Sequence, residues 1–585
     1  MKILFSILPG CLPNLVHDPG KWWDAAAASK EHEYAYFNAN EMWWRAFCSS
    51  SFVGILAEKL PLAKIISEKL SSSAGIPGLE KLALRAGASL EAMRAPATYA
   101  SAASYAAALK PFSDYLRVFN FLVDEFSVGV QNGPVVNGLG FRETAEMLAF
   151  SGKDTVLRAS YRAAAAKLPF TPDACFIPVT SEFDLLSALV WAQCLKELNP
   201  GVYICVTDPG YENFSLDWQA EAIVRTGAVF QLIDSVIKHS YEADRVMPLL
   251  LRDLAAGKRP AGFLTAADFT GEPPASDGET CPPLLHVFTP EPSFLLRLSG
   301  KGCYWNKCAF CAQHSKHQSG AAPEKADIDA TFPRIERLAR LGYKYFYFED
   351  EAVHPDLLNH FSDLVLAKGL DIKWGCRCRL DARHPDELLN KIKRAGCSEI
   401  FFGVETVVPR VQALMRKYPD PVPAETTRAV IKAAAAAGLG QHLTFITGFP
   451  GETPEEAKTT AAFIAETLKD LPRVTYHIGR LNLLPQAETY KNAPKYGIVP
   501  GPFKGDLNCY CDFTFTDGSL AAADKVSAEN LPELQRGLDA ALGWDRFEKT
   551  PEQKLVRELY FNYAIRVYIK ARESDIFADR ELLSA

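Results

Sequence analysis

Three closely spaced cysteines, Cys303, Cys308 and Cys311, lie in the segment 298–311, which reads Leu-Ser-Gly-Lys-Gly-Cys-Tyr-Trp-Asn-Lys-Cys-Ala-Phe-Cys. A closed structural zinc site takes four protein ligands, whereas three cysteines that hold a 4Fe-4S cluster leave one iron open to a substrate or cofactor. The count of three therefore favours an iron-sulfur centre that does chemistry. The alternative is a zinc knuckle with a distant fourth ligand, for which the candidates are His314, Cys376 and Cys378.

The cysteine loop follows an apolar run at 294–298 that is predicted to be a strand. Five further strands, alternating with five helices, are predicted from there to residue 481. In βα barrels, the loops at the carboxyl ends of the strands build the site. We therefore expect a partial (β/α)6 barrel over 293–484, with the cysteines at its mouth.

A second alternation of strands and helices precedes this barrel. Strands are predicted at 1–8, 175–180, 202–206 and 229–233, and helices at 183–198, 216–226 and 241–254. This order implies parallel strands joined by right-handed crossovers, with ligands at the carboxyl ends of the strands. The fold class is therefore predicted to be α/β, with a Rossmann-like domain over 1–265.

Three other stretches complete the predicted organisation. Residues from about 22 to 167 are rich in alanine and aromatics and are expected to form a helical insertion without visible chemistry. Residues 266–292 carry several prolines and are interpreted as a linker. Residues 485–585 are expected to be mostly helical, and their Cys509 and Cys511 are too close together for a convincing cluster site, which favours free thiols.

Composition bounds the partners of the chain. The 585 residues are 48% hydrophobic and carry a net charge of −7, so the chain offers large cores but no basic field for nucleic acid. The apolar run at the start stops at Pro9 and is too short to span a membrane. The fourteen cysteines are scattered and follow no secretory signal, which favours a reducing cytoplasm over a disulfide framework.

The cysteine loop is accompanied by three further motifs, Phe348-Glu-Asp-Glu351, Phe402-Gly-Val-Glu-Thr406 and Phe445-Ile-Thr-Gly-Phe-Pro-Gly-Glu-Thr453. Together they resemble the radical S-adenosylmethionine (SAM) superfamily over roughly 294–484. The Rossmann-like segment before them resembles the cobalamin-binding domain of the class that joins cobalamin to radical SAM chemistry. The cysteines are separated by four and then two residues, where the superfamily usually has three and then two. A variant that begins Cys-Tyr-Trp is familiar among cobalamin-type members of peptide natural-product pathways.

The resemblance implies that Cys303, Cys308 and Cys311 hold the cluster and that SAM chelates the fourth iron. It further implies that the backbone of Phe310 contacts the adenine. Asp350 or Glu351 would bind the SAM ammonium, although acidic residues are also common where a helix begins. Gly448 and Gly451 would let the backbone approach the adenosine, although glycine turns are common.

Two arginines and one glutamate complete the implied SAM site. Arg377 or Arg379 would pair with the SAM carboxylate in two-point geometry, and the other would make a structural ion pair. Glu405 would bind the ribose hydroxyls. The alternative for Glu405 is a buried acid at a strand end with a structural partner.

The loops after the predicted strands of the first domain are the candidate cobalamin site. They contain Thr180, Ser181, Asp208, Pro209, Gly210, Ser240 and Tyr241. No Asp-x-His-x-x-Gly motif occurs, so no histidine is offered from that motif as a lower ligand of cobalt. The alternative is a degenerate, empty Rossmann domain.

These features predict a cobalamin-dependent radical SAM enzyme, and most specifically a C-methyltransferase that acts on a carbon of a peptide or small natural-product precursor. Its cofactors would be a 4Fe-4S cluster, SAM and cobalamin, its electron donor a flavodoxin or ferredoxin, and its C-terminal region a cap on the barrel. No side chain is assigned as a catalytic residue. The alternatives are a rearrangement, ring contraction or cyclisation, a polar methyl transfer, and a non-catalytic cobalamin- or metal-binding scaffold.

Overall fold

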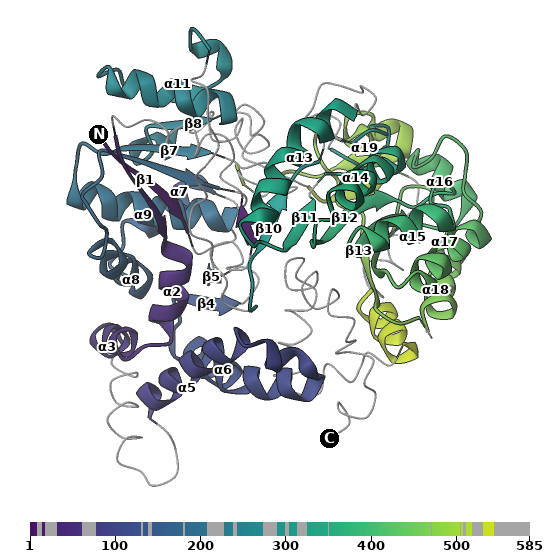
Figure 1. Ribbon diagram of the computed structural model, residues 1–585, viewed down its shortest axis with the longest axis horizontal. Coiled ribbons are helices and arrows are strands. Elements are labelled where there is room, and N and C mark those ends of the chain that lie inside the picture. The colour runs from purple at the N-terminus through teal and green to yellow at the C-terminus, as the bar shows by residue number, and fades with distance from the viewer. Residues whose placement is uncertain are drawn as a thin grey trace. The chain divides into compact units, whose positions relative to one another are not determined.

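The computed structural model describes residues 1–8, 15–17, 32–60, 78–129, 133–137, 143–179, 182–207, 227–237, 243–272, 289–298, 303–312, 325–348, 350–469, 471–503, 505–506, 511–516 and 531–542. The chain divides into two compact units, built mainly from Met1–Thr98 with Ser104–Pro292 and from Ser293–Phe503. Each unit is organised around its own parallel sheet (Figure 1). The predicted α/β class is therefore confirmed.

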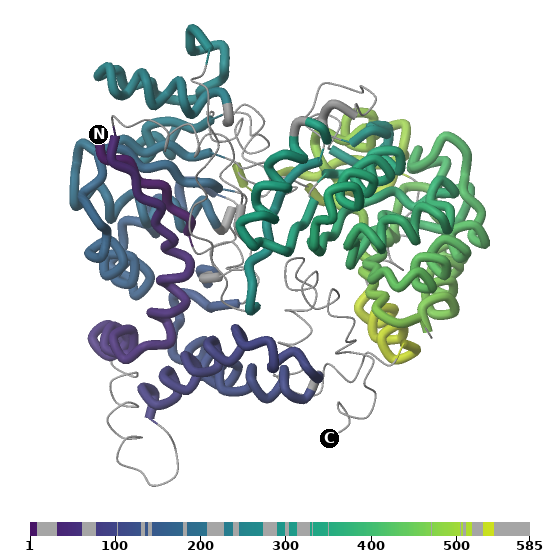
Figure 2. The backbone as a smooth tube through the Cα atoms, in the orientation of Figure 1, coloured from purple at the N-terminus to yellow at the C-terminus, as the bar shows by residue number. Residues whose placement is uncertain are grey.

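The sheet of the first unit has the strand order β3-β1-β6-β7-β8-β9, and every pair in it is parallel. Its strands are β1 (Lys2–Ile7), β3 (Glu33–Asn38), β6 (Ala174–Pro178), β7 (Tyr203–Thr207), β8 (Ser235–Ile237) and β9 (Gly262–Leu264). Strand β7 reads Tyr-Ile-Cys-Val-Thr and is buried along its whole length, as expected where helices cover both faces. In Figure 2, the purple β1 lies beside the blue β6, which follows much later in the chain.

Helices cover the two faces of this sheet. On one face, α11 (Ala243–Ala255) packs against Phe5 of β1. On the other face, Trp191 of α9 (Glu182–Leu198) donates its indole N–H to Ser6, at 3.1 Å. Neighbouring residues of β1 thus serve opposite faces, which is the period-two alternation of a strand.

The predicted helical insertion is only partly helical. It contains α2 (Ala39–Phe47), α3 (Ser50–Lys59), α5 (Leu79–Met93), α6 (Ala102–Leu122), α7 (Thr144–Ser151) and α8 (Val156–Ala165). The same stretch also supplies the edge strand β3 and a short antiparallel pair, β4 (Phe126–Gly129) with β5 (Gly133–Val136). Strand β3 reads Glu-Tyr-Ala-Tyr-Phe-Asn, and it lacks the β-branched residues that mark strands in a sequence.

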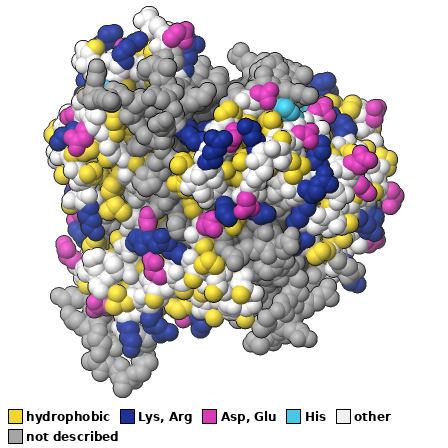
Figure 3. Space-filling view, viewed as in Figure 1, with side chains coloured by type: hydrophobic (Ala, Val, Ile, Leu, Met, Phe, Trp, Pro, Cys, Tyr) yellow, Lys and Arg dark blue, Asp and Glu magenta, His cyan; other side chains and the backbone are white. Residues whose placement is uncertain are grey.

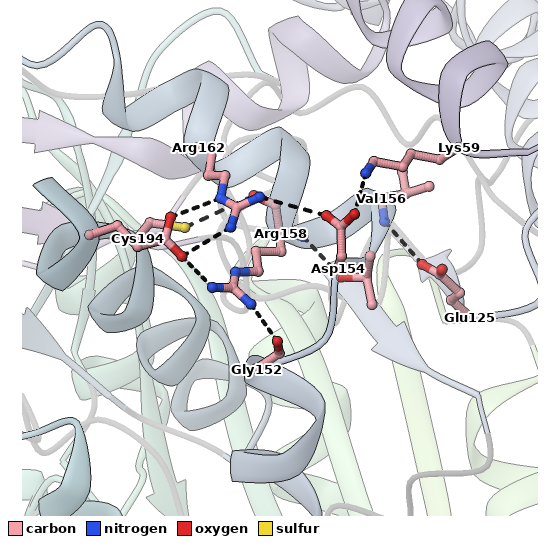
Figure 4. A network of polar contacts seen from close by, with 10 residues as sticks. Lys59, Glu125, Gly152, Asp154, Val156, Arg158, Arg162 and Cys194 are labelled. Atoms are coloured by element: carbon pink, nitrogen blue, oxygen red, sulfur yellow. Dashed lines mark hydrogen bonds and ion pairs between the residues drawn. The ribbon is translucent and has the colours of Figure 1, made fainter.

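An ion network ties the insertion to the sheet helix α9 (Figure 4). Glu197 of α9 accepts hydrogen bonds from Arg162 Nε, at 2.8 Å, and from the buried Arg158, both of α8. Arg162 also approaches Asp154, at 3.6 Å, and Asp154 pairs with Lys59 of α3 at 2.5 Å. The network thereby fixes α3 and α8 relative to α9.

One strand of the first unit was wrongly predicted. Residues 229–233 do not form a strand, because Ala228–Gln231 make a 3-10 helix and the strand begins only at Ser235. A short apolar run is shared by a strand and a buried helical turn, so periodicity alone does not separate them. The helix predicted at 216–226 lies outside the described residues.

The second unit contains all six predicted strands, which are parallel and lie in sequence order from β10 to β15. They are β10 (Ser293–Leu296), β11 (Tyr345–Phe348), β12 (Lys373–Arg379), β13 (Cys397–Glu405), β14 (Gly440–Thr447) and β15 (Val474–Arg480). The helices between them are α13 (Lys325–Arg340), α14 (Pro355–Lys368), α15 (Asp386–Arg394), α16 (Pro409–Met415), α17 (Ala424–Ala436) and α18 (Pro454–Leu468). Only α16 was not predicted.

The described part of the C-terminal region packs on the cysteine loop. It contains α19 (Glu488–Lys491) and the antiparallel pair β16 (Ile498–Pro500) and β17 (Phe513–Phe515). Thr489 N donates to Ala309 O at 3.0 Å, and residues of this region share a buried apolar cluster with Ala309. Residues 531–541 are helical, whereas Cys509 and the residues after 542 lie outside the described chain.

Candidate functional site

The three cysteines follow β10, as predicted, and each is a partly buried free thiol. Backbone contacts to the end of α16 hold their loop. Ala309 N donates to Met415 O, and the indole of Trp305 donates to Arg416 O, both at 2.8 Å. The loop is therefore fixed against α16 on both sides of Cys308.

The described residues contain no group of three His, Cys, Asp or Glu side chains that converges on a single metal ion. A zinc ion needs such convergence, because its ligands lie roughly 2.0–2.3 Å from one centre. The cysteines of a cluster each bind a different iron and need not converge in this way. Of the alternative zinc ligands, His314 lies outside the described residues, and Cys376 and Cys378 are buried in β12 with their sulfurs 3.8 Å apart.

Positive charge surrounds the middle cysteine of the loop. Burial raises the pKa of the Cys308 thiol to about 11, while Lys417 and Arg379 act in the opposite direction. An iron that binds here must displace the thiol proton, and the two cations favour the resulting thiolate. The donor set and its surroundings thus fit an anionic metal centre.

Arg379, at the end of β12, is a buried arginine that makes no ion pair with any residue that the structure describes. Only 4% of its surface is exposed. Its guanidinium lies over the rings of Trp305, at 4.4 Å, and of Tyr418, at 5.1 Å. Its Nε and Nη2 have no hydrogen-bond partner in the part of the chain that the structure describes. A buried guanidinium with two unused donors is suited to a carboxylate bound in two-point geometry.

Arg377 lies two residues earlier in the same strand, is less buried than Arg379, and has a different environment. Its guanidinium is 6.0 Å from the ring centroid of Tyr347 and 5.7 Å from that of Phe401. Both arginines were expected just after the third strand, but β12 continues through Arg379. The strand was predicted too short because the charged residues in Cys-Arg-Cys-Arg interrupt its apolar pattern.

Glu405 ends β13 and has a structural partner, which the alternative interpretation expected, although Lys417 itself was not predicted. Its carboxylate Oε1 is 2.9 Å from Nζ of the buried Lys417, and its Oε2 is 3.5 Å from the Thr444 hydroxyl. Glu405 has a φ of 65° and follows an irregularity in the pairing of β13 with β14, a conformation that non-glycine residues adopt mainly under local constraint. Glu405 is therefore a positioned carboxylate with one oxygen committed to Lys417.

Two sequence signals point to this ion pair in hindsight. Pro409 occupies the first turn of α16, a position that proline favours, and α16 carries the chain back so that Lys417 reaches Glu405. Gly403 leaves the necessary room, because a Cβ there would lie 2.8 Å from Glu405 Oε1 and 2.9 Å from Lys417 Nζ.

The acidic pair after β11 is engaged with the residues that lead into the cysteine loop. Asp350 is buried and accepts a hydrogen bond from Leu298 N at 2.8 Å. Glu351 pairs with Arg297 at 3.2 Å. These contacts hold the end of β10, and the role of either carboxylate toward a SAM ammonium stays a prediction.

Phe310 belongs to the cysteine loop, and Gly448 belongs to the turn after β14. Phe310 packs against the apolar cluster of Ala309, and its ring centroid is 6.0 Å from Lys417 Nζ. Gly448 has a φ of 74°, and its N–H donates to the buried Glu452 at 2.6 Å. Burial raises the pKa of Glu452 to about 7. Gly451, with a φ of 88°, completes this glycine-dependent turn after β14.

The seven predicted cobalamin residues, Thr180, Ser181, Asp208, Pro209, Gly210, Ser240 and Tyr241, lie outside the described residues. The strands before them are described, and β6, β7 and β8 are adjacent and parallel. The loops that follow them therefore leave the same edge of the sheet.

Two properties of the described chain concern its surface charge and the hydropathy of its helices. On the face in Figure 3, basic side chains are mixed with acidic ones and do not gather into one field. Among the described residues, no helix is long and apolar enough to cross a membrane.

The comparisons with known proteins identify the second unit. Residues 298–464 match the family model of the radical SAM superfamily. A protein of Pyrococcus horikoshii, named as the uncharacterized methyltransferase PH0819, is 30% identical over 175 residues, which are 28% of this chain and 35% of that protein. The match thus spans about a third of the length of this relative. Residues 298–464 thus match the superfamily that the motifs of this segment predicted, the radical SAM superfamily.

Two solved structures are similar to the chain to different degrees. The apo form of OxsB, described as a cobalamin-dependent SAM radical enzyme, has a TM-score of 0.51 at 12% identity and covers 97% of this chain and 71% of its own. TsrM of Kitasatospora setae, described as a radical SAM methyltransferase and solved with tryptophan and a SAM analogue, has a TM-score of 0.45 at 15% identity, over 69% of this chain and 85% of its own. The likeness to OxsB shows that the Rossmann-like sheet and the radical SAM sheet occur together in a known fold.

Proposed function

We propose that this radical SAM enzyme is cobalamin-dependent and transfers a methyl group to a carbon of a peptide or small natural-product precursor. The observation that carries the SAM site is Arg379, a buried guanidinium with two unused donors next to the cysteine loop. Cobalamin and methyl transfer are supported by the fold shared with OxsB and by the name of the Pyrococcus relative.

When bound, the cluster and SAM supply reductive radical chemistry, and cobalamin supplies a methyl carrier. Cys303, Cys308 and Cys311 would hold the cluster. Arg379 would hold the SAM carboxylate, and Glu405 Oε2 would accept a ribose hydroxyl while Oε1 stays paired with Lys417. The aromatic rings around Arg379 keep water from its guanidinium and strengthen its pairing with an anion.

The partners and the compartment belong to the same proposal. The electron donor would be a flavodoxin or ferredoxin, and the protein would work in the cytoplasm without nucleic acid or membrane. All eleven cysteines in the described chain are free thiols, which supports a reducing compartment. The competing function is a cobalamin-type rearrangement, ring contraction or cyclisation, for which the site would need the same cluster and SAM contacts.

Metal analysis tests the cluster. Anaerobically reconstituted protein should contain about four irons and four sulfides per chain, and the triple variant of Cys303, Cys308 and Cys311 to alanine should lose them. Cys194→Ala, on α9 of the other unit, is the matched control and should keep the iron. One zinc per chain in place of iron, with no iron-sulfur absorption after reconstitution, would overturn the assignment.

Isotope transfer tests the methyl reaction. With methyl-labelled SAM, hydroxocobalamin and a low-potential reductant that supplies the two electrons needed to form cob(I)alamin, the label should appear on protein-bound cobalamin. The one-electron-reduced, cob(II)alamin form should be detectable on the protein by electron paramagnetic resonance (EPR). Protein that makes 5′-deoxyadenosine but never binds cobalamin would refute this route. Cobalamin that binds without ever taking the label would favour the rearrangement class.

A further inference from the structure

Three buried charged side chains act electrostatically on the Cys308 thiol, and they do not balance one another. Arg379 and Lys417 are positive and Glu405 is negative, and each is less than 10% exposed. The nearby Asp381 does not supply the missing charge, because it pairs with Arg383 at 2.7 Å. Buried charge is costly without a counter-ion, so the surplus positive charge calls for an anion in this space.

Lys417 is held in a fixed relation to the cysteine loop. It follows Arg416, which ends α16 with a φ of 54°. The carbonyls of Met415 and Arg416 accept the hydrogen bonds from Ala309 and Trp305 that fix the loop, at 2.8 Å each. Two successive residues before Lys417 are thus bonded to the loop on either side of Cys308, so the backbone that carries the Lys417 side chain is fixed relative to the loop.

The ammonium itself has one anchoring partner. Lys417 Nζ lies 2.9 Å from Glu405 Oε1 and 6.0 Å from the ring centroid of Phe310, the residue before Cys311. The side chains of Lys417 and Glu405 are 7% and 10% exposed. Since water and salt barely reach the pair, its field at the cysteine loop is weakly screened.

We propose that the Lys417–Glu405 pair sets the one-electron reduction potential of the cluster held by the three cysteines. The inference rests on the proposed function, because it needs that cluster. A low-potential donor of the flavodoxin or ferredoxin type gives one electron to the oxidised cluster. The net charge of the cluster then becomes more negative by one. A fixed positive charge nearby stabilises the reduced state and raises the potential, and a fixed negative charge lowers it.

Lys417 and Glu405 therefore act in opposite directions. The lysine makes the cluster easier to reduce, and the glutamate limits this effect while it holds the ammonium in place. Arg379 is a less suitable regulator of the SAM-bound enzyme, because the SAM carboxylate would neutralise its charge. The two residues act on the reaction through their electrostatic effect on the cluster, and neither residue needs to touch the substrate.

The test is an EPR-monitored redox titration of reconstituted protein without SAM, with dithionite as the reductant. Lys417→Met should lower the midpoint potential by at least about 59 mV, which corresponds to a tenfold change in the one-electron equilibrium constant. Glu405→Gln should raise it. Lys417→Arg, which keeps the charge, and Lys432→Met, which removes an exposed lysine of α17, should leave it close to the wild-type value.

Midpoint potentials that shift in opposite directions in Lys417→Met and Glu405→Gln would indicate a charge effect. Damage to the site would shift the midpoint potentials of both variants in the same direction. If Lys417→Met takes up no iron, the rise in Glu405→Gln and the unchanged Lys417→Arg still decide the question. Potentials that stay at the wild-type value in both Lys417→Met and Glu405→Gln would overturn the inference. Wild-type protein that takes up no iron would overturn the proposed function instead.

Discussion

The guanidinium carbon of Arg379 lies 4.4 Å from the ring centroid of Trp305, and Trp305 belongs to the cysteine loop. The indole N–H of Trp305 is bonded to Arg416 O at 2.8 Å, so the ring is a fixed surface under the arginine. The loop that carries the cysteines therefore also holds the arginine in one orientation. A ligand that reaches both the cysteine loop and Arg379 meets a preorganised guanidinium.

Replacement of Arg379 by methionine should weaken SAM binding with the cluster intact. The loss of a two-point charged hydrogen bond costs about 1.5–3 kcal/mol, which is roughly a 10- to 100-fold fall in affinity. Equilibrium dialysis of labelled SAM against reconstituted protein measures it. Arg394→Met removes an exposed arginine of α15 and should have no effect. A larger loss in Arg377→Met than in Arg379→Met would assign the carboxylate to Arg377.

Alanine at Gly403 should disturb the Glu405–Lys417 pair. Its Cβ would lie 2.8 Å from Glu405 Oε1 and 2.9 Å from Lys417 Nζ, so one of the two groups must move. Overpacking of this kind costs about 1–3 kcal/mol, and a lower thermal midpoint and weaker SAM binding should follow together. Gly54→Ala in α3, where nothing lies within 4 Å of the new Cβ, should be neutral or slightly stabilising. Full SAM affinity in Gly403→Ala would show that the ribose contact does not depend on this pair.

Glu452 should make the stability of the second unit dependent on pH. Burial raises its folded-state pKa to about 7, above the roughly 4.3 of a free glutamate. The stability that it contributes is therefore fully present below the unfolded pKa and is lost as pH rises through about 7. The total change is on the order of 3 kcal/mol.

Calorimetry at pH 5.5 and pH 8 checks this dependence. The thermal midpoint of the wild type should fall more between the two values than that of Glu452→Gln, because the glutamine stays neutral. Glu466→Gln, at an exposed carboxylate of α18, is the control and should follow the wild type. Equal pH slopes in the wild type and Glu452→Gln would show that Glu452 does not titrate on folding.

Glu197 should contribute to the stability of the first unit through Arg158. Alanine at 197 removes the carboxylate that pairs with both Arg158 and Arg162 and leaves the buried Arg158 with the Gly152 carbonyl as its remaining partner. We expect a loss of roughly 1–3 kcal/mol, measured by thermal unfolding. Glu91→Ala, which breaks the exposed pair with Arg45, should cost less than about 1 kcal/mol. Equal losses of stability in Glu197→Ala and Glu91→Ala would mean that the burial of Arg158 does not strengthen the contribution of its ion pair to stability.

Much of the fold was accessible from the sequence because its signals are local. The six strands of the second unit and the position of the cysteine loop after β10 follow from apolar runs and helical periodicity. Strand β3 was missed because it is an edge strand without β-branched residues, and its place depends on pairing with β1, which no local pattern reports. The 3-10 helix at Ala228–Gln231 was mistaken for a strand because both use the same apolar run.

The site was accessible in outline but not in its electrostatics. Spacing and motif found Cys308, Arg379 and Glu405, since each sits in a recognisable sequence context. Lys417 has no such context, because its importance comes from α16 returning the chain to the end of β13. The sequence likewise left Arg377 and Arg379 equivalent. Nε lacks a hydrogen-bond partner among the described residues in both, and only the greater burial of Arg379 and its second such donor, Nη2, separate them.

The pairing of β1 with β6 has a consequence for synthesis of the chain. Lys2 N is bonded to Asp173 across 171 residues, whereas strands β10 to β15 each pair with the next strand in sequence. On a ribosome that adds about 5–20 residues per second, β1 waits roughly 10–30 s for β6 to be made. One edge of β1 can pair early with β3, but five of its six residues are buried in the finished sheet, so its other edge and its apolar faces stay uncovered during that time. The first unit therefore has a long window for aggregation, while the second unit gains each strand's partner soon after the strand is made.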